Sequence, residues 1–289
     1  MIATVGDSTM LSSQAQIDEN APAELLQLDA DHPGFHDAVY RRRRNEIARA
    51  ALDYREGQPV PSIGYTEQEH DVWAEVWRHL DPLHDRYACR AYRDAGDRIA
   101  LSRERIPQLT AVNSTIQPLL GFHMTPVAGL VAAKSFLSQL GRDVFLSTQY
   151  MRHHSVPLYT PEPDVVHELI GHAATFADPT FVALNRAFGE AAIRAQDAET
   201  IERIGRLYWY TLEFGVLREG DRLRVYGAGL LSSFGELGRF EREEELLDWN
   251  VDDIAETPYD PTQYQQKLFV APSFETMADD VQRWLSRVG

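Results

Sequence analysis

Residues 161–172, PEPDVVHELIGH, place two histidines, His167 and His172, five positions apart. In the zinc-peptidase helix the two histidines occupy positions i and i+4, which lie within roughly 40° of each other on one face. Five positions on an ideal α-helix separate the side chains by roughly 140°. The pair can share one metal only if this turn is wound more loosely than an α-helix, or if His172 lies just past the helix end. Gly171 supplies backbone freedom for either arrangement, although two ordinary core or surface histidines would give the same spacing.

A single acid interrupts the apolar run WYTLEFGVL over residues 209–217. An ionised carboxylate at Glu213 would cost several kcal/mol to bury unless it were paired or bound to a metal. An Arg or Lys from elsewhere in the chain is one solution. The other joins Glu213 to His167 and His172, which makes a set of two histidines and one carboxylate. Such a set leaves open positions on the metal and suits a non-haem Fe(II) oxygenase.

A guanidinium lies just upstream of the histidines, in TQYMRH over residues 148–153. Arg152 can hold a carboxylate through two parallel hydrogen bonds, so it favours an amino-acid substrate. Asp164 could orient Arg152, or it could cap the helix that follows.

Charge and composition restrict the partners of the chain. Its 289 residues carry 28 Lys and Arg against 44 Asp and Glu, a formal charge of -16, which argues against nucleic acid and against a membrane surface. The one cysteine excludes an intramolecular disulfide and a Cys-rich zinc site. No apolar run is long enough for a spanning helix. We therefore expect a cytoplasmic protein.

The pattern along the chain predicts one mainly α domain with a few short strands. Residues 1–27 have weak periodicity and predict a flexible extension, so that the domain covers 28–289. Helices are expected over 40–54, 67–80, 126–141, from Pro179, over 198–219 closed by Gly220, and from Ser273 onward. Extended chain is expected over 143–152 and 268–271.

Six segments together resemble the catalytic domain of the pterin-dependent aromatic amino acid hydroxylases, in order and from about Leu28 to the C-terminus. These segments are LDADHPGF, TPVAGL, TQYMRH, YTPEPDVVHELIGH, YWYTLEFG and YGAGLLSSFGEL. Within that family the chain looks most like the single-domain phenylalanine hydroxylases.

The resemblance implies a ligand set, two co-substrates and a substrate site. A ferrous ion would be held by His167, His172 and Glu213, with a tetrahydropterin and O2 as co-substrates. Phe136 would stack on the pterin, Glu168 would hydrogen-bond near it and so would not be a hydrolytic base, and Tyr208 would lie beside the iron. The residues expected around the aromatic L-amino acid are Arg152, Thr160 and Ser232 at its amino-acid end, and Pro163, Trp209 and Phe214 around its ring.

Few positions choose among phenylalanine, tyrosine and tryptophan. Trp209 matches the phenylalanine and tyrosine enzymes, and Val270 matches the phenylalanine type, so hydroxylation of L-phenylalanine to tyrosine is favoured. Two departures near the pocket, Ala174 in place of the family's proline and Leu268 in place of the animal enzymes' tyrosine, leave 3-hydroxylation to meta-tyrosine open.

Other readings stay open beside this one. They are a tryptophan or tyrosine hydroxylase of the same family, a zinc metallohydrolase using His167, Glu168 and His172, and a non-enzymatic descendant that binds a pterin or a protein. Because the resemblance includes neither the regulatory domain nor the oligomerisation arm of the animal enzymes, we expect a monomer.

Overall fold

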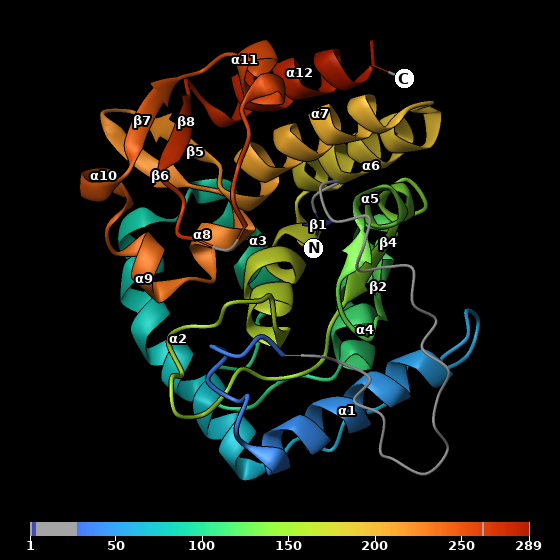
Figure 1. The fold of residues 1–289 in the computed structure, drawn as a ribbon. Helices are drawn as coiled ribbons and strands as arrows, with labels where there is room; N and C mark the ends of the chain where they lie inside the picture. Colours follow the sequence, from blue (N-terminus) through green and yellow to red (C-terminus); the bar gives the residue numbers. More distant parts are fainter. Residues whose placement is uncertain (1, 4–27, 262, 289) are drawn as a thin grey trace.

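The computed structural model describes residues 2–3, 28–261 and 263–288, and Figure 1 shows a mainly helical chain with a few short strands, as predicted. The expected extension over 1–27 lies outside the described residues except for Ile2–Ala3. These two residues form strand β1, which pairs in parallel with β3 (Val131–Ala132).

Four helices make the first third of the chain: α1 (Ala38–Asp53), α2 (Glu67–Tyr87), α3 (Arg90–Ile99) and α4 (Leu109–Leu120). Helix α2 begins with a capping box, in which Thr66 and Glu69 each accept a hydrogen bond from the other's backbone N–H. Its predicted apolar face is buried in full: Val72, Trp73, Val76, Trp77 and Leu80. The helical period of this segment therefore predicted the core correctly.

The predicted helix over 126–141 is wrong in its first half. Strand β2 (His123–Pro126) pairs in parallel with β4 (Val144–Ser147), and helix α5 covers only Ala133–Leu140. Pro126 pairs with Ser147 of β4, and Val131 and Ala132 pair with β1, so partners outside this segment hold its first half out of a helix. The stop at Gly141 and the extended chain over β4 are confirmed.

The predicted helix over 198–219 is also wrong in its second half. After α6 (Pro179–Arg194), which Asp178 caps, helix α7 covers Ala198–Tyr208 and passes into a π-helical turn, η3 (Trp209–Glu213). Strand β5 (Val216–Glu219) then turns back as β6 (Arg222–Val225). Gly220, with a φ of 62°, makes the turn of this hairpin and does not end a helix.

A four-stranded sheet stands at one end of the molecule in the order β6-β5-β8-β7 (Figure 1). Its last strands are β7 (Glu245–Asp248) and β8 (Lys267–Ala271), which confirms the strand expected at 268–271. Short helices α8 (Ala228–Leu231), α9 (Phe234–Leu237), α10 (Phe240–Glu243) and α11 (Val251–Glu256) connect the strands. Ser273 caps the terminal helix α12 (Phe274–Leu285), as expected.

Two more turns lie deep in the single large core: the π-helical turn η1 (His167–His172) and the 3-10 turn η2 (Ala173–Ala177). Every residue of both turns is buried. Among the described helices, none combines the length and the apolar character that crossing a bilayer would need.

Candidate metal centre and substrate site

The two histidines occupy the first and last positions of η1, a turn wound more loosely than an α-helix. A π-helical turn closes i→i+5 hydrogen bonds and has more residues per turn than an α-helix, so it brings side chains at i and i+5 closer to one face. The Nε2 atoms of His167 and His172 lie 3.0 Å apart, with their rings nearly perpendicular. The loosened turn that the spacing predicted is confirmed.

Gly171 has a different role from the one its sequence position suggested. Its φ is not positive, so it supplies no unusual backbone angle. A Cβ at this position would instead lie 2.8 Å from the carbonyl oxygen of Ala228. Gly171 therefore lets η1 pack directly against α8, and a larger residue would push the two turns apart.

Glu213 ends the second π-helical turn, η3, and is 4% exposed. Its Oε1 lies 3.1 Å from His172 Nε2, and its Oε2 lies 3.4 Å from His167 Nε2. Gly227 packs against this turn so closely that a Cβ there would lie 2.4 Å from the Glu213 carbonyl oxygen. The glycine-rich stretch before α8 thus fixes the backbone that carries the carboxylate.

The three side chains fit a single metal ion. Ligand atoms about 2.1 Å from one metal are spaced roughly 3.0 Å apart at octahedral angles and roughly 3.4 Å apart at tetrahedral ones. The two imidazole nitrogens are 3.0 Å apart, His172 Nε2 lies 3.1 Å from Glu213 Oε1 and His167 Nε2 lies 3.4 Å from Glu213 Oε2, so the carboxylate faces the pair with both oxygens and each spacing falls in that range. Two imidazoles and a carboxylate on one face are the donor set of non-haem Fe(II) sites, which keep other positions open.

Electrostatics put His167 and Glu213 in the protonation states that a metal requires. Burial lowers the pKa of His167 to about 3, so its imidazole is neutral. Burial by itself raises the pKa of the Glu213 carboxyl, but the neighbouring His172 and His167 outweigh burial and bring it to about 2. A neutral imidazole and an ionised carboxylate can both coordinate a cation without first losing a proton.

Ser232 orients one of the histidines. Its hydroxyl donates to the carbonyl of Ala228 at 2.7 Å, so its oxygen is free to accept from His167 Nδ1, 3.0 Å away. A proton on Nδ1 leaves the Nε2 lone pair for the metal. The sequence placed Ser232 at the amino-acid end of the substrate, and this contact with a ligand histidine was missed.

Glu168 is fully buried and points a free oxygen into the protein. Its Oε1 accepts from the backbone N–H and the hydroxyl of Thr148, at 3.1 and 3.0 Å. Its Oε2 has no hydrogen-bond partner in the described part of the chain, and burial raises the pKa of this carboxyl. A buried polar atom without a partner costs free energy, so the geometry fits a polar ligand at this point.

Tyr208 and Phe136 pack beside this carboxylate and the ligand set. The Tyr208 hydroxyl is buried, and it too lacks a partner among the residues described. Burial and the nearby Glu213 and Glu168 raise the pKa of Tyr208. Phe136 is fully buried, and its ring meets the rings of Phe145 and Tyr208 edge to face. Its stacking on a pterin stays a prediction.

Arg152 is held by Asp164 in a buried, two-pronged ion pair. Arg152 Nε and Nη2 donate to the two carboxylate oxygens at 2.9 and 2.8 Å, and the backbone N–H of Arg152 donates to the same group. Asp164 Oδ1 also accepts from the His167 N–H at 3.4 Å, so Asp164 both orients Arg152 and caps the turn that carries the histidine. Within the described part of the chain, Nη1 makes a single 3.5 Å contact, with the carbonyl of Pro157, which leaves it available to a substrate carboxylate.

An aromatic wall stands next to the ligand set. Trp209 opens η3, stacks on Tyr259 at 4.1 Å and lies 4.6 Å from the ring of Phe214. The Trp209 indole N–H donates to Gln265 Oε1 at 2.8 Å. Gln265, like Thr148, was missed because it lies in a loop without periodicity and its partner is distant in sequence.

Thr160 and Pro163 complete the set expected from the sequence. The Thr160 hydroxyl donates to the carbonyl of Glu162, and the Pro163 carbonyl accepts from the Tyr150 hydroxyl. Both lie in the half-buried loop between Arg152 and η1. Their contacts with a substrate stay predictions.

Comparison with known proteins agrees with this arrangement. The family model described as "Biopterin-dependent aromatic amino acid hydroxylase" matches residues 15–289. The chain belongs to this family. Membership favours the oxygenase reading of the ligand set over the zinc metallohydrolase.

Hydroxylases of more than one specificity are similar to this chain. Phenylalanine-4-hydroxylase of Rattus norvegicus is 42% identical over 267 residues, 91% of this chain and 59% of that protein. Tyrosine 3-monooxygenase of Canis lupus familiaris is 42% identical over 266 residues, 90% of this chain and 54% of that protein. The chain thus spans less than two thirds of the length of these hydroxylases.

Solved hydroxylase structures share the fold. Phenylalanine hydroxylase of Chromobacterium violaceum, with bound oxidised Fe(III), superposes with a TM-score of 0.73 at 26% identity, covering 81% of this chain and 87% of that one. A second structure of that enzyme, with iron(III) and 7,8-dihydrobiopterin, also gives 0.73 at 26% identity, covering 83% and 90%.

Proposed function

We propose that this protein is a ferrous, tetrahydropterin-dependent monooxygenase that hydroxylates the ring of L-phenylalanine, with the 4-position favoured. The observation that carries the proposal is the convergence of His167, His172 and Glu213 within 3.4 Å of one another in a buried site. Iron bound there, with a tetrahydropterin, would supply the activation of O2 that this chemistry needs.

The residues of the chain bind and orient the reactants. The free Nη1 of Arg152 would receive the carboxylate of the amino acid, since Asp164 already fixes the guanidinium plane. Thr160 and Ser232 would assist at the same end. Trp209 and Phe214, with Pro163, would wall the aromatic ring and exclude water from it.

Two buried groups support a pterin beside the metal. The partnerless Oε2 of Glu168 would accept a hydrogen bond from a pterin N–H, while Thr148 holds the rest of that carboxylate still. Phe136 would supply an aromatic face for the pterin ring. Tyr208 would place its hydroxyl near the iron.

Two residues favour phenylalanine over tyrosine and tryptophan as the substrate. Trp209 fits the phenylalanine and tyrosine types, and Val270, half-buried on β8, fits the phenylalanine type. Tyrosine hydroxylation is the second candidate, because the tyrosine 3-monooxygenase matches this chain as closely as the phenylalanine enzymes do. The two positions that depart from the family pattern, Leu268 and Ala174, are both buried in the core. Because they were expected near the pocket, hydroxylation at the 3-position of the ring is a third outcome to test.

One assay separates these outcomes. Protein loaded with Fe(II) is incubated with tetrahydropterin, O2 and each of phenylalanine, tyrosine and tryptophan, and the products are identified by chromatography. We expect para-tyrosine from phenylalanine at the highest kcat/KM. Omission of the pterin should abolish the product. Pterin-independent peptide cleavage by a zinc-loaded form, or no turnover with any of the three amino acids, would overturn the proposal.

A further inference from the structure

A second group of potential metal ligands lies outside the catalytic centre, where the start of α1 meets the segment that follows Arg152. It consists of Asp37, His153 and His154, whose ligand atoms all lie within 4.8 Å of one another. We propose that this group binds a divalent transition-metal ion, with Zn²⁺ as the best fit. Two imidazoles and one carboxylate are ligands that zinc accepts in a tetrahedral site, and a water would fill the fourth position.

The spacing of the two less exposed ligands suits such an ion. His153 Nε2 lies 3.3 Å from Asp37 Oδ2. Ligand atoms about 2.0–2.1 Å from a tetrahedral zinc are roughly 3.3–3.4 Å apart. An ion could therefore sit between these two atoms without moving either residue.

Contacts behind the ligands hold both of them in place. Asp37 Oδ1 accepts from the backbone N–H groups of Val39 and Tyr40, which leaves Oδ2 as the outward oxygen. His153 Nδ1 accepts from the backbone N–H of Ser155 at 3.3 Å and lies 2.7 Å from Ser155 Oγ, so these two contacts fix the orientation of the ring and leave Nε2 facing Asp37. The Tyr40 ring packs against the edge of His153 at 4.9 Å, and the His153 side chain is only 8% exposed.

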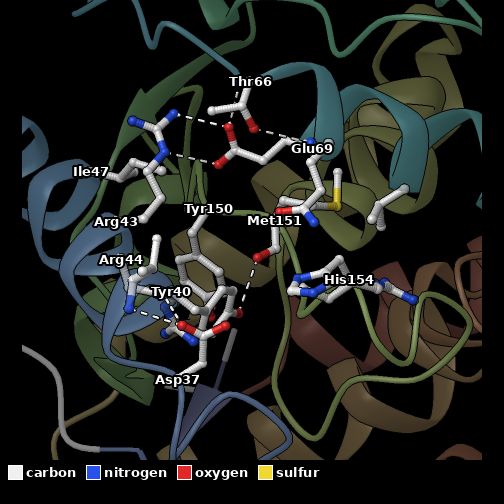
Figure 2. A pocket seen from close by; sticks show the side chains of 14 residues that line it. Asp37, Tyr40, Arg43, Arg44, Ile47, Thr66, Glu69, Tyr150, Met151 and His154 are labelled. Carbon is white, nitrogen blue, oxygen red and sulfur yellow. Dashed lines mark hydrogen bonds and ion pairs between the residues drawn. The ribbon is translucent and has the colours of Figure 1, made fainter.

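His154 supplies the third ligand from the solvent side. It is exposed, its ring lies 4.4 Å from that of His153, and within the part of the chain that the structure describes it makes no hydrogen bond or ion pair. Its nitrogens are therefore available to an ion at no cost in existing contacts. With Asp37 it lines a cavity of about 140 Å³ between α1, α2 and residues 150–154 (Figure 2).

The charges around the cavity favour a cation at this group. The cavity's arginines each have a carboxylate of their own: Arg43 with Glu69, Arg44 with Glu162, and Arg152 with Asp164. Asp37 accepts hydrogen bonds from the Val39 and Tyr40 N–H groups through Oδ1 alone, so its second oxygen faces the group. Among the residues that the structure describes, Asp37 is paired with His153 and with no arginine, so its charge can be balanced by a bound ion.

The test uses iron-loaded holoenzyme under anaerobic conditions, dialysed against Zn²⁺, with iron and zinc measured separately by elemental analysis. We expect one zinc per chain with the iron retained. His154→Ala should weaken zinc binding at least about tenfold and leave iron content and zinc-free turnover unchanged. Asp37→Asn should do the same, because asparagine keeps the helix cap but removes the anionic ligand.

A matched control is His79→Ala, which removes a partly exposed histidine of α2 that is far from the group in sequence. This variant should bind zinc as tightly as the unchanged protein does. Three results would overturn the proposal: no zinc bound while iron stays, zinc uptake equal to iron loss, or zinc binding unchanged in both His154→Ala and Asp37→Asn. Absence of bound zinc, or zinc binding that both substitutions leave unchanged, would show that this group does not bind the ion. Zinc uptake equal to iron loss would show that the zinc occupies the catalytic centre.

Discussion

The side-chain oxygen of Gln265 accepts the indole N–H of Trp209 at 2.8 Å, and both residues are buried. Gln265 is itself fixed, since its backbone N–H donates to Glu236 at 2.9 Å and its amide contacts the carbonyls of Asp260 and Gln263. One loop residue thus sets the plane of the ring expected to wall the substrate. Trp209 is held from the other side by its stacking on Tyr259.

Replacing Gln265 by alanine should therefore loosen Trp209. The buried indole N–H would lose its partner, which costs about 1–3 kcal/mol of stability. We expect kcat/KM for phenylalanine to fall about tenfold and the preference for phenylalanine over tryptophan to narrow. The measurements are urea unfolding and steady-state kinetics with both amino acids. Gln266→Ala, which removes the exposed neighbour, is the control and should leave both quantities unchanged.

The substitution of Arg152 by alanine should raise the KM for the amino acid about a hundredfold, with a smaller effect on kcat, because the charged hydrogen bond from Nη1 to the substrate carboxylate is lost. It should also destabilise the protein by about 3–5 kcal/mol, since Asp164 is then a buried charge without its partner.

The double variant Arg152→Ala with Asp164→Asn separates these effects. It removes the unpaired charge and should recover part of the stability, yet the KM should stay high. An Arg152→Ala enzyme with an unchanged KM would show that the guanidinium only holds Asp164 and the η1 turn.

Glu213→Ala should abolish iron binding while the fold survives. Iron content should fall from about one per chain to near zero, because the substitution removes the one anionic ligand of the set and leaves only the two histidines. Elemental analysis gives the iron content and circular dichroism the fold. Glu241→Ala, an exposed acid on α10, should keep full iron and turnover. Retention of iron by Glu213→Ala would remove this residue from the ligand set.

The sequence predicted the chemistry of the centre better than the elements that carry it. The i, i+5 spacing of His167 and His172 allowed a loosened turn or a position past the helix end, and the structure has the loosened turn. The single acid in an apolar run needed a partner, either a basic residue or a metal with the two histidines, and the structure places Glu213 beside both histidines. The helix boundaries near Val131 and Val216 were missed because strand partners distant in sequence, β1 and β8, decide them.

The contacts that orient Trp209 and His167 could not be predicted from the sequence, because their partners are also distant along the chain. Gln265 reaches Trp209 across 56 positions, and Ser232 reaches His167 across 65. Neither shows a periodicity or a spacing that could point to its partner. The close packing of Gly171 on Ala228 is likewise a property of two turns brought together by the fold.

The buried carboxyl of Glu236 should make the free energy of unfolding depend on pH. Burial raises the pKa of its carboxyl from 4.5 to about 7. Between these values the folded protein keeps a proton that the unfolded chain has lost, so this group's contribution falls as pH rises from about 4.5 to 7, by roughly 3 kcal/mol in all. Glu236→Gln keeps an acceptor for the Gln265 N–H and should be more stable than the unchanged protein at pH 7.5 but not at pH 4.5. Equal unfolding free energies at pH 7.5 would contradict this.

Ser232 offers a choice between two roles, since the sequence places it at the substrate and the structure places its oxygen 3.0 Å from His167 Nδ1. If it orients the histidine, Ser232→Ala should weaken iron binding about 10–100-fold, because the imidazole loses the acceptor that fixes its proton on Nδ1. Iron affinity is measured by competition with a chelator, and the KM for phenylalanine is measured at saturating iron. Ser233→Ala removes the neighbouring hydroxyl, which caps α9 and does not touch His167, and it should bind iron normally. An iron affinity that is unchanged in Ser232→Ala, with a raised KM, would assign the hydroxyl to the substrate and leave His167 oriented by the π-helical turn alone.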